Sequence, residues 1–232
     1  MPAIATGEPI QHDSLARLPG VTAARLVLAS ASPARRKLLD AAGIDCEVLV
    51  SGVDESTVDA SKPEALSLTL ARLKAQAVAR RLVATGRAAT ADSPRLLVLG
   101  CDSVLDFDGH ILGKPAEAAD ATRRWRAMRG GKGVLHTGHC LIDVGAGKQT
   151  EAGAATTVHF ADIDDDEIDA YVATGEPLAV AGAFTVDGLG APFIAGIEGD
   201  QGTVIGLSLP LLRTMLADLG VRITDLWRPT LT

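Results

Sequence analysis

The sequence predicts an α/β protein built on a mixed, twisted sheet flanked by helices. Short apolar runs alternate with longer helix-like stretches through the first half of the chain, an order typical of α/β folds. The second half adds strand-like segments that can pair antiparallel. Hydrophobic residues make up 47% of the 232 residues and charged residues 22%, which is a globular rather than a disordered composition.

Each element in the first half rests on a local pattern. An apolar run predicts a strand over 26–29, and Ser32 followed by Pro33 predicts the start of a helix that continues to residue 42 and ends at Gly43. A second strand over 47–50 precedes a long helix over 63–85, because leucines recur there on one helical face. The continuous apolar run at 96–99 is typical of a buried central strand.

The second half is predicted by similar signals. A helix over 118–129 ends at two glycines, and a glycine-rich turn separates strands over 134–144 and 154–160. Carboxylates in its first turn favour a helix over 164–174, and Ser208 caps a last helix over 208–219. Residues 1–24 lack a sustained period and contain three prolines, so we expect an irregular extension followed by one domain over 25–232.

Charge and composition exclude several classes of protein. A net charge of −7 argues against a general nucleic-acid coat, which needs a basic surface. No apolar run reaches the roughly 18 residues that a membrane span needs. The first residues show no charged segment followed by an apolar one, so we expect no secretory signal. Three widely spaced cysteines without a CxxC pair favour reduced thiols, so we expect a cytoplasmic protein.

The turn after the first strand carries the first functional signal. Small residues, among them Ser30 and Ser32, lead into a helix whose free backbone N–H groups can bind an anion. Arg35 and two basic neighbours lie in the first helical turn, where each exposed cation opposes the helix dipole by roughly 0.3–1 kcal/mol. A bound phosphate would reverse this penalty. The alternative is a solvated basic turn with an ordinary Ser-Pro cap.

Other charged residues follow strands or turns. Asp102 lies just beyond the apolar run 96–99, at the end of a strand where α/β sheets form sites, and can ligate Mg²⁺ or activate a water. Capping of the next turn is the alternative. Glu55, Lys74 and Lys114 are weak signals when taken singly. We interpret the six carboxylates between 162 and 169 as a solvated helix start, because they lack the spacing of a calcium loop.

The order and spacing of these motifs resemble the Maf family of nucleoside triphosphate pyrophosphatases, from about residue 25 to 219. The segments that carry the resemblance are Leu28–Arg35, Val53–Glu55, Lys74-Ala75, Gly100–Ser103, Gly113–Pro115, Thr137-Gly138, Ala181–Phe184, Ile197–Asp200 and Gly206–Pro210. The resemblance implies hydrolysis of a nucleoside triphosphate to the monophosphate and pyrophosphate, with a divalent metal such as Mg²⁺ or Mn²⁺. It also implies a fold similar to that of the inosine triphosphate pyrophosphatases, with a central cleft, and a homodimer.

The resemblance further implies roles for individual residues. Asp102 corresponds to the catalytic proton acceptor of the family, and Glu55 and Asp102 are expected to hold the metal. The phosphate-binding turn corresponds to Ser30, Ser32 and Arg35, and further contacts to the substrate to Lys74 and Lys114. Such a site fits an enzyme that removes noncanonical or modified nucleotides.

One departure from the family concerns the base. Residues 179–180 and Asp187 stand where members that prefer thymidine and uridine triphosphates carry Asp-Lys and Gln. Asp187 is similar instead to a branch associated with methylated guanosine triphosphates, in which a carboxylate can accept hydrogen bonds from the base. We therefore expect Asp187 to bind substrate.

Two other functions are compatible with the sequence. A nucleotidyltransferase would need a second substrate and a Gly-Gly loop, whose place is taken by Ala31, Ser32 and Pro33. A non-catalytic, nucleotide-binding regulator of cell division would bind without turnover, and the presence of Asp102 and the residues expected around it argues against a dead site.

Overall fold

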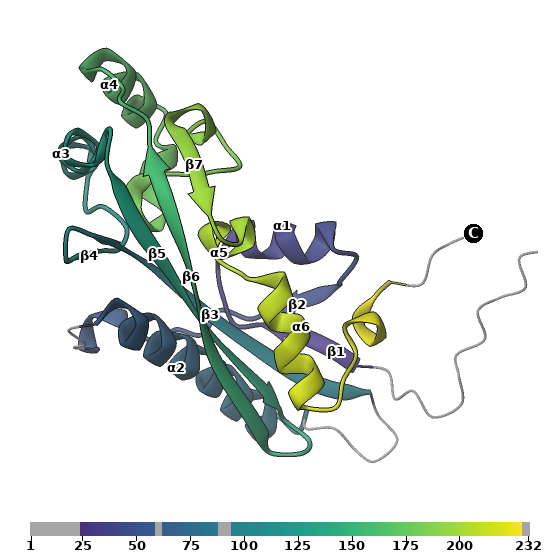
Figure 1. The fold of residues 1–232 in the computed structure, drawn as a ribbon. Helices are drawn as coiled ribbons and strands as arrows, with labels where there is room; N and C mark the ends of the chain where they lie inside the picture. The colour runs from purple at the N-terminus through teal and green to yellow at the C-terminus, as the bar shows by residue number, and fades with distance from the viewer. Residues whose placement is uncertain (1–23, 59–61, 88–93, 229–232) are drawn as a thin grey trace, which may run out of the picture.

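The computed structural model describes residues 24–58, 62–87 and 94–228 and confirms the α/β class. The predicted extension therefore lies outside the described residues, except for Ala24, which already belongs to the first strand. A seven-stranded mixed sheet has the order β2-β1-β3-β5-β6-β7, with β4 paired to β3 (Figure 1). The strands are β1 Ala24–Leu28, β2 Cys46–Val48, β3 Arg95–Phe107, β4 His110–Leu112, β5 Lys132–Asp143, β6 Lys148–Phe160 and β7 Ile194–Glu198. The α-helices are α1 Pro33–Ala41, α2 Pro63–Ala84, α3 Ala118–Met128, α4 Asp165–Ala173, α5 Gln201–Ile205 and α6 Leu209–Asp218.

The predicted caps begin the helices. The Ser32 side chain accepts a hydrogen bond from the backbone N–H of Arg35 at the start of α1, and Ser208 caps α6. At the start of α4, Asp164 and Glu167 form a reciprocal capping box. The acidic segment 162–169 is therefore a helix start, as predicted.

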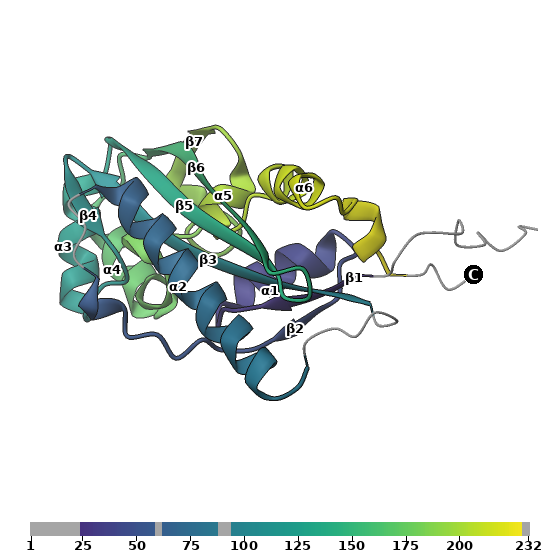
Figure 2. The ribbon, with the colours of Figure 1, turned by 90° about the horizontal axis from the view of Figure 1, so that it is seen from below.

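Side chains on the two faces of the sheet enter different cores. Leu26 and Leu28 pack with α1 and α6, whereas Val27 and Ala29 pack with α2, because successive strand residues point to opposite faces. Both views show α2 on one side of the sheet and α1, α5 and α6 on the other (Figures 1 and 2). A third core, centred on the fully buried Trp125, joins α3 and α4 to the far end of the sheet.

Among the residues that the structure describes, no strand pairs with the central part of one edge of β3. β1 pairs with β3 as far as Leu28 against Leu99, and β4 pairs with β3 only from Leu105 onward. Between Leu99 and Leu105, roughly 20 Å of this edge is open, while the opposite edge stays paired with β5. We call this stretch the open edge of β3. It lies between the end of β1 and the start of the pairing with β4.

The open edge corrects one prediction. The strand predicted over 96–99 continues to Phe107, so Asp102 lies inside β3 rather than beyond it. The two residues that follow the apolar run, Gly100 and Cys101, are still buried, and the strand continues past Asp102 because it stays paired with β5. The short elements β4, β7 and α5 were not predicted. Asp108 and Gly109 form the turn between β3 and β4, and both have positive φ, as a two-residue hairpin turn requires.

In the described part of the chain, no helix is long and apolar enough to cross a membrane.

Candidate active site

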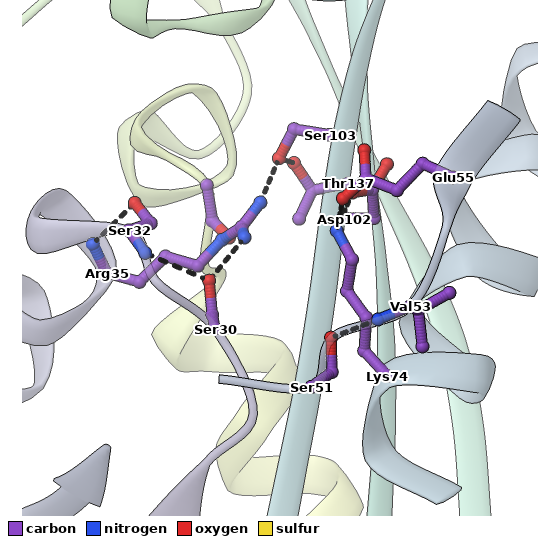
Figure 3. A network of polar contacts seen from close by, with 11 residues as sticks. Ser30, Ser32, Arg35, Ser51, Val53, Glu55, Lys74, Asp102, Ser103 and Thr137 are labelled. Carbon is purple, nitrogen blue, oxygen red and sulfur yellow. Dashed lines mark hydrogen bonds and ion pairs between the residues drawn. The ribbon is translucent and has the colours of Figure 1, made fainter. Parts of the chain in front are cut away.

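Arg35 carries a buried positive charge surrounded by neutral acceptors. Its side chain reaches across from α1 and is only 8% exposed. Its Nε donates to the carbonyl oxygen of Gly206 at 2.7 Å, and its two terminal nitrogens donate to the hydroxyls of Ser30 at 2.9 Å and Ser103 at 3.0 Å (Figure 3). No described carboxylate forms an ion pair with it. A buried cation without a counter-ion is costly, so this position favours an anionic ligand.

A chain of hydroxyls holds the acceptors of Arg35 in place. The Oγ atoms of Ser103 and Thr137 lie 2.9 Å apart, and Thr137 donates to the carbonyl oxygen of Thr203 at 2.8 Å. Ser30 also accepts from the backbone N–H of Ser32 at 3.2 Å, which shapes the turn after β1. The turn is therefore preorganised around the guanidinium group.

A second cation lies between two carboxylates. The Nζ of Lys74, from α2, is 2.5 Å from Asp102 Oδ1 and 2.6 Å from Glu55 Oε1 (Figure 3). Asp102 is 7% exposed, whereas the Glu55 side chain is 56% exposed. Burial raises the pKa of Asp102, and the nearby positive charges of Lys74 and Arg35 only partly offset this effect.

Close packing of α2 brings Lys74 to Asp102. A Cβ at Gly100, two residues before Asp102 on the same face of β3, would lie 2.8 Å from the backbone nitrogen of Ala75 and closer still to the carbonyl oxygen of Ala71. Gly138 on β5 makes a similar close approach to α2. Glycine at these positions lets the helix backbone contact the sheet directly, and this contact sets the height of Lys74 above Asp102.

The two halves of the site meet at the open edge of β3. Asp102 and Ser103 are consecutive strand residues, so their side chains point to opposite faces. Arg35 therefore approaches from the α1 face and Lys74 from the α2 face, on either side of the open edge (Figure 3). Although Arg35 lies on the opposite face of the strand, its positive charge still acts on Asp102, because it offsets part of the rise in the pKa of that carboxyl. The structure thus brings together Ser30, Arg35, Glu55, Lys74 and Asp102.

Three predicted residues have other surroundings. Ser32 caps α1, as predicted, and its part in phosphate binding stays a prediction. Lys114 and Asp187 are exposed, and their side chains make no hydrogen bond or ion pair with any described residue. Lys114 follows β4, the strand at the far end of the open edge, and its backbone is fixed because Arg124 donates to the Gly113 carbonyl oxygen at 2.7 Å.

Sequence reasoning missed the contribution of Gly206. Its carbonyl oxygen accepts from Arg35, and its φ of 121° lies in a region that favours glycine. A Cβ there would also lie 3.0 Å from Arg35 Nε. The available signal was Gly206 itself, two residues before the Ser208 cap of α6.

The carboxylates of the site suit a metal ion that is bound partly by the phosphates of a substrate, rather than a metal ion bound by protein side chains alone. Glu55 and Asp102 share the Lys74 ammonium, which shows that their oxygens converge on one cation. Within the described residues, no group of three or more His, Cys, Asp or Glu side chains could hold a metal ion. Mg²⁺ is commonly bound by one or two carboxylates and completed by substrate phosphates and waters. The two carboxylates fit that pattern.

The fold and the site define a class of protein: an α/β protein whose converging cations and paired carboxylates suit a phosphorylated ligand. Residues 25–219 match the model of the family described as Maf-like protein, and the chain belongs to the Maf family.

Three similar proteins carry the name nucleoside triphosphate pyrophosphatase. The protein from Salinispora tropica is 66% identical over 203 residues, which cover 88% of this chain and 87% of the relative. The protein from Streptomyces coelicolor is 60% identical over 205 residues, 88% of this chain and 95% of the relative. The protein from Nostoc punctiforme is 48% identical over 202 residues, which cover 87% of this chain and 97% of the relative.

Proposed function

We infer that this protein hydrolyses a nucleoside triphosphate to the nucleoside monophosphate and pyrophosphate. Family membership and the names of relatives up to 66% identical support this function. The observation that carries it is structural: the buried Arg35 lacks a carboxylate partner among the described residues and lies across the open edge from Lys74, Asp102 and Glu55. Arg35 offers an uncompensated positive charge to a phosphate, and Glu55 and Asp102 offer carboxylate oxygens to a divalent cation that would accompany a triphosphate.

The cations of the site bind the triphosphate. Arg35 presents a planar fork of donors suited to phosphate oxygens, and Ser30 holds that fork in place. Lys74 adds a point charge, and Lys114, whose ammonium is exposed, is proposed as a further contact to the phosphates. A divalent cation, Mg²⁺ or Mn²⁺, held by Glu55 and Asp102 would neutralise further charge on the phosphates.

Asp102 acts as the proton acceptor. The oxygen of a water forms a bond to the α-phosphorus, the bond from that phosphorus to the bridging oxygen breaks, and pyrophosphate leaves with the electron pair. The proton of the water passes to the Asp102 carboxylate, whose Oδ1 accepts from Lys74 in this structure. Burial raises the pKa of Asp102 and makes the carboxylate a better base than an exposed aspartate. Positioning and charge stabilisation supply the rest of the catalysis.

The substrate class follows from Asp187. Its exposed carboxylate can accept hydrogen bonds from the N–H and amino groups of a guanine-like edge. We therefore propose modified purine nucleoside triphosphates as substrates and removal of noncanonical nucleotides as the role. The homodimer implied by the family resemblance stays a prediction, which light scattering would check.

The function is tested with a panel of canonical and modified nucleoside triphosphates plus Mg²⁺ or Mn²⁺, by measuring monophosphate and pyrophosphate. Asp102→Asn is expected to fold normally and release no pyrophosphate. Asp106→Asn, on the same strand, is the matched control and retains turnover. Turnover by Asp102→Asn would reject the role of that carboxylate. Tight binding without turnover would identify a nucleotide-binding regulator. Turnover that requires a second, acceptor substrate would identify a nucleotidyltransferase.

A further inference from the structure

One carboxylate outside the catalytic group organises a whole segment. Glu176, at the start of the short helix Glu176–Ala179, accepts four hydrogen bonds. Its Oε1 accepts from Tyr171 Oη at 3.0 Å, Thr185 Oγ1 at 2.6 Å and the Gly190 N–H at 3.0 Å, and its Oε2 accepts from the Leu189 N–H at 3.0 Å. Three of these donors belong to the segment 185–190, which we call the Glu176 loop.

The backbone of the Glu176 loop is shaped to fit this carboxylate. A Cβ at Gly188 would lie 2.5 Å from Glu176 Oε2, and a Cβ at Gly190 would lie 2.5 Å from the hydroxyl oxygen of Tyr171. Glycine at both positions lets the chain wrap closely around the carboxylate. Two partners are backbone N–H groups and two are hydroxyls that donate to Glu176, so the arrangement favours the ionised form. Partial burial raises the pKa of Glu176, but the hydrogen bonds from Thr185, Leu189 and Gly190 outweigh it and leave the pKa lowered.

The Glu176 loop is held firmly and its Val186 packs against the core around Trp125, yet two of its side chains stay exposed. Asp187 is exposed and unpaired among the described residues, and Leu189 is 59% exposed. Three hydrogen bonds to one carboxylate thus hold the backbone of a loop that presents Asp187 to solvent, and they limit where the Asp187 carboxylate can lie.

We propose that Glu176 is a positioning residue that fixes the Glu176 loop and thereby sets the nucleobase selectivity exerted by Asp187. The inference rests on the proposed function, because it deepens the account of how that site selects its substrate. Glu176 does not contact the substrate in this proposal; it acts through the backbone N–H groups of Leu189 and Gly190, which fix the direction of the Asp187 side chain.

The test compares Glu176→Gln with Tyr171→Phe. The glutamine has the same shape, but its amide NH₂ replaces one acceptor oxygen and faces N–H donors. The phenylalanine removes the Tyr171 hydroxyl, which belongs to α4 and also interacts with Thr185, but it leaves the three contacts from the loop to Glu176 intact. The first readout is amide hydrogen exchange at Leu189 and Gly190. We expect at least tenfold faster exchange in Glu176→Gln and unchanged exchange in Tyr171→Phe.

The second readout is the ratio of kcat/KM between the best and the poorest nucleoside triphosphate. We expect about a tenfold smaller ratio in Glu176→Gln, the same direction of change in Asp187→Gln, and no further change when both are combined. Thr185→Val, which removes one side-chain donor of the loop, is expected to give a smaller change in the same direction and replaces Glu176→Gln if that variant does not fold.

The outcomes separate the inference from the proposed function. If the wild-type protein releases pyrophosphate from no nucleotide, the proposed function fails, and the exchange measurement still reports on the loop. If the wild type is active but Glu176→Gln and Thr185→Val lower kcat/KM equally for all nucleotides, or leave the ratio unchanged, Glu176 has no part in selectivity and the inference is rejected.

Discussion

Gly100→Ala tests whether the contact between α2 and β3 builds the catalytic group. The added methyl would lie 2.8 Å from the Ala75 nitrogen, 2.9 Å from the Ala75 Cβ and closer still to the Ala71 carbonyl oxygen. Two of these three atoms belong to the backbone, so rotation of a side chain cannot make room. The whole of α2 must therefore move away from the sheet, and Lys74 moves with it.

The expected magnitude follows from overpacking. Inserting a methyl group into a well-packed core costs about 1–3 kcal/mol, and the upper end applies because helix backbone is displaced. For a chain of this size, a destabilisation of about 3 kcal/mol corresponds to a fall in Tm of roughly 6–12 °C. Since the Lys74 Nζ is 2.5 Å from Asp102 Oδ1, a shift of about 1 Å breaks that contact, and a misplacement of this size can lower kcat about a hundredfold.

The assay combines thermal unfolding with pyrophosphate release measured well below Tm. Gly153→Ala is the matched control, because Gly153 also lies in a long strand of the same sheet and a Cβ there meets no atom within 4 Å. We expect the control to keep both Tm and activity. A Gly100→Ala protein with unchanged Tm and unchanged kcat would refute the argument that this close approach positions Lys74.

Three further predictions concern the charges of the site. Lys74→Gln removes a cation that holds the pKa of Asp102 down, so that pKa rises further. Because the base must be ionised, the acidic limb of the pH profile of kcat is expected to move to higher pH. An unmoved limb would exclude Asp102 as the base. Arg35→Lys keeps the charge but cannot reproduce three hydrogen bonds from one planar group, so KM for the nucleotide should rise at least tenfold in steady-state kinetics, and an unchanged KM would remove Arg35 from phosphate binding. Removing divalent cations with a chelator should abolish pyrophosphate release and adding Mg²⁺ or Mn²⁺ should restore it, whereas full activity in the chelated protein would contradict a metal held by Glu55 and Asp102.

Elements with local signals were predicted well from the sequence. The starts of α1 and α6 follow from Ser32 and Ser208, because an N-cap bonds to backbone only three residues away. The end of β3 was placed wrongly, since strand length depends on which distant segments pair along each edge. The three-residue strand β4 carries too few residues for a periodic pattern to show.

The candidate site divides in the same way. Residue chemistry alone singled out Arg35 and Asp102, because a basic first helical turn and an acidic residue after an apolar run are visible locally. The two carboxylates on Lys74 and the neutral surroundings of Arg35 were not visible, since they arise from contacts 28 and 171 residues apart along the chain.

The α/β class, the helix starts and the kinds of charge that the protein can offer a ligand were readable from the amino-acid sequence, because capping, periodicity and side-chain chemistry are properties of neighbouring residues. The approach of Arg35 and Lys74 to opposite faces of one strand became visible only in the folded protein, since it depends on the direct packing of α2 on Gly100 and on strand pairing between distant segments. The attachment of the Glu176 loop also became visible only there, since it depends on side-chain hydrogen bonds between residues 9 to 14 positions apart, which no local pattern encodes.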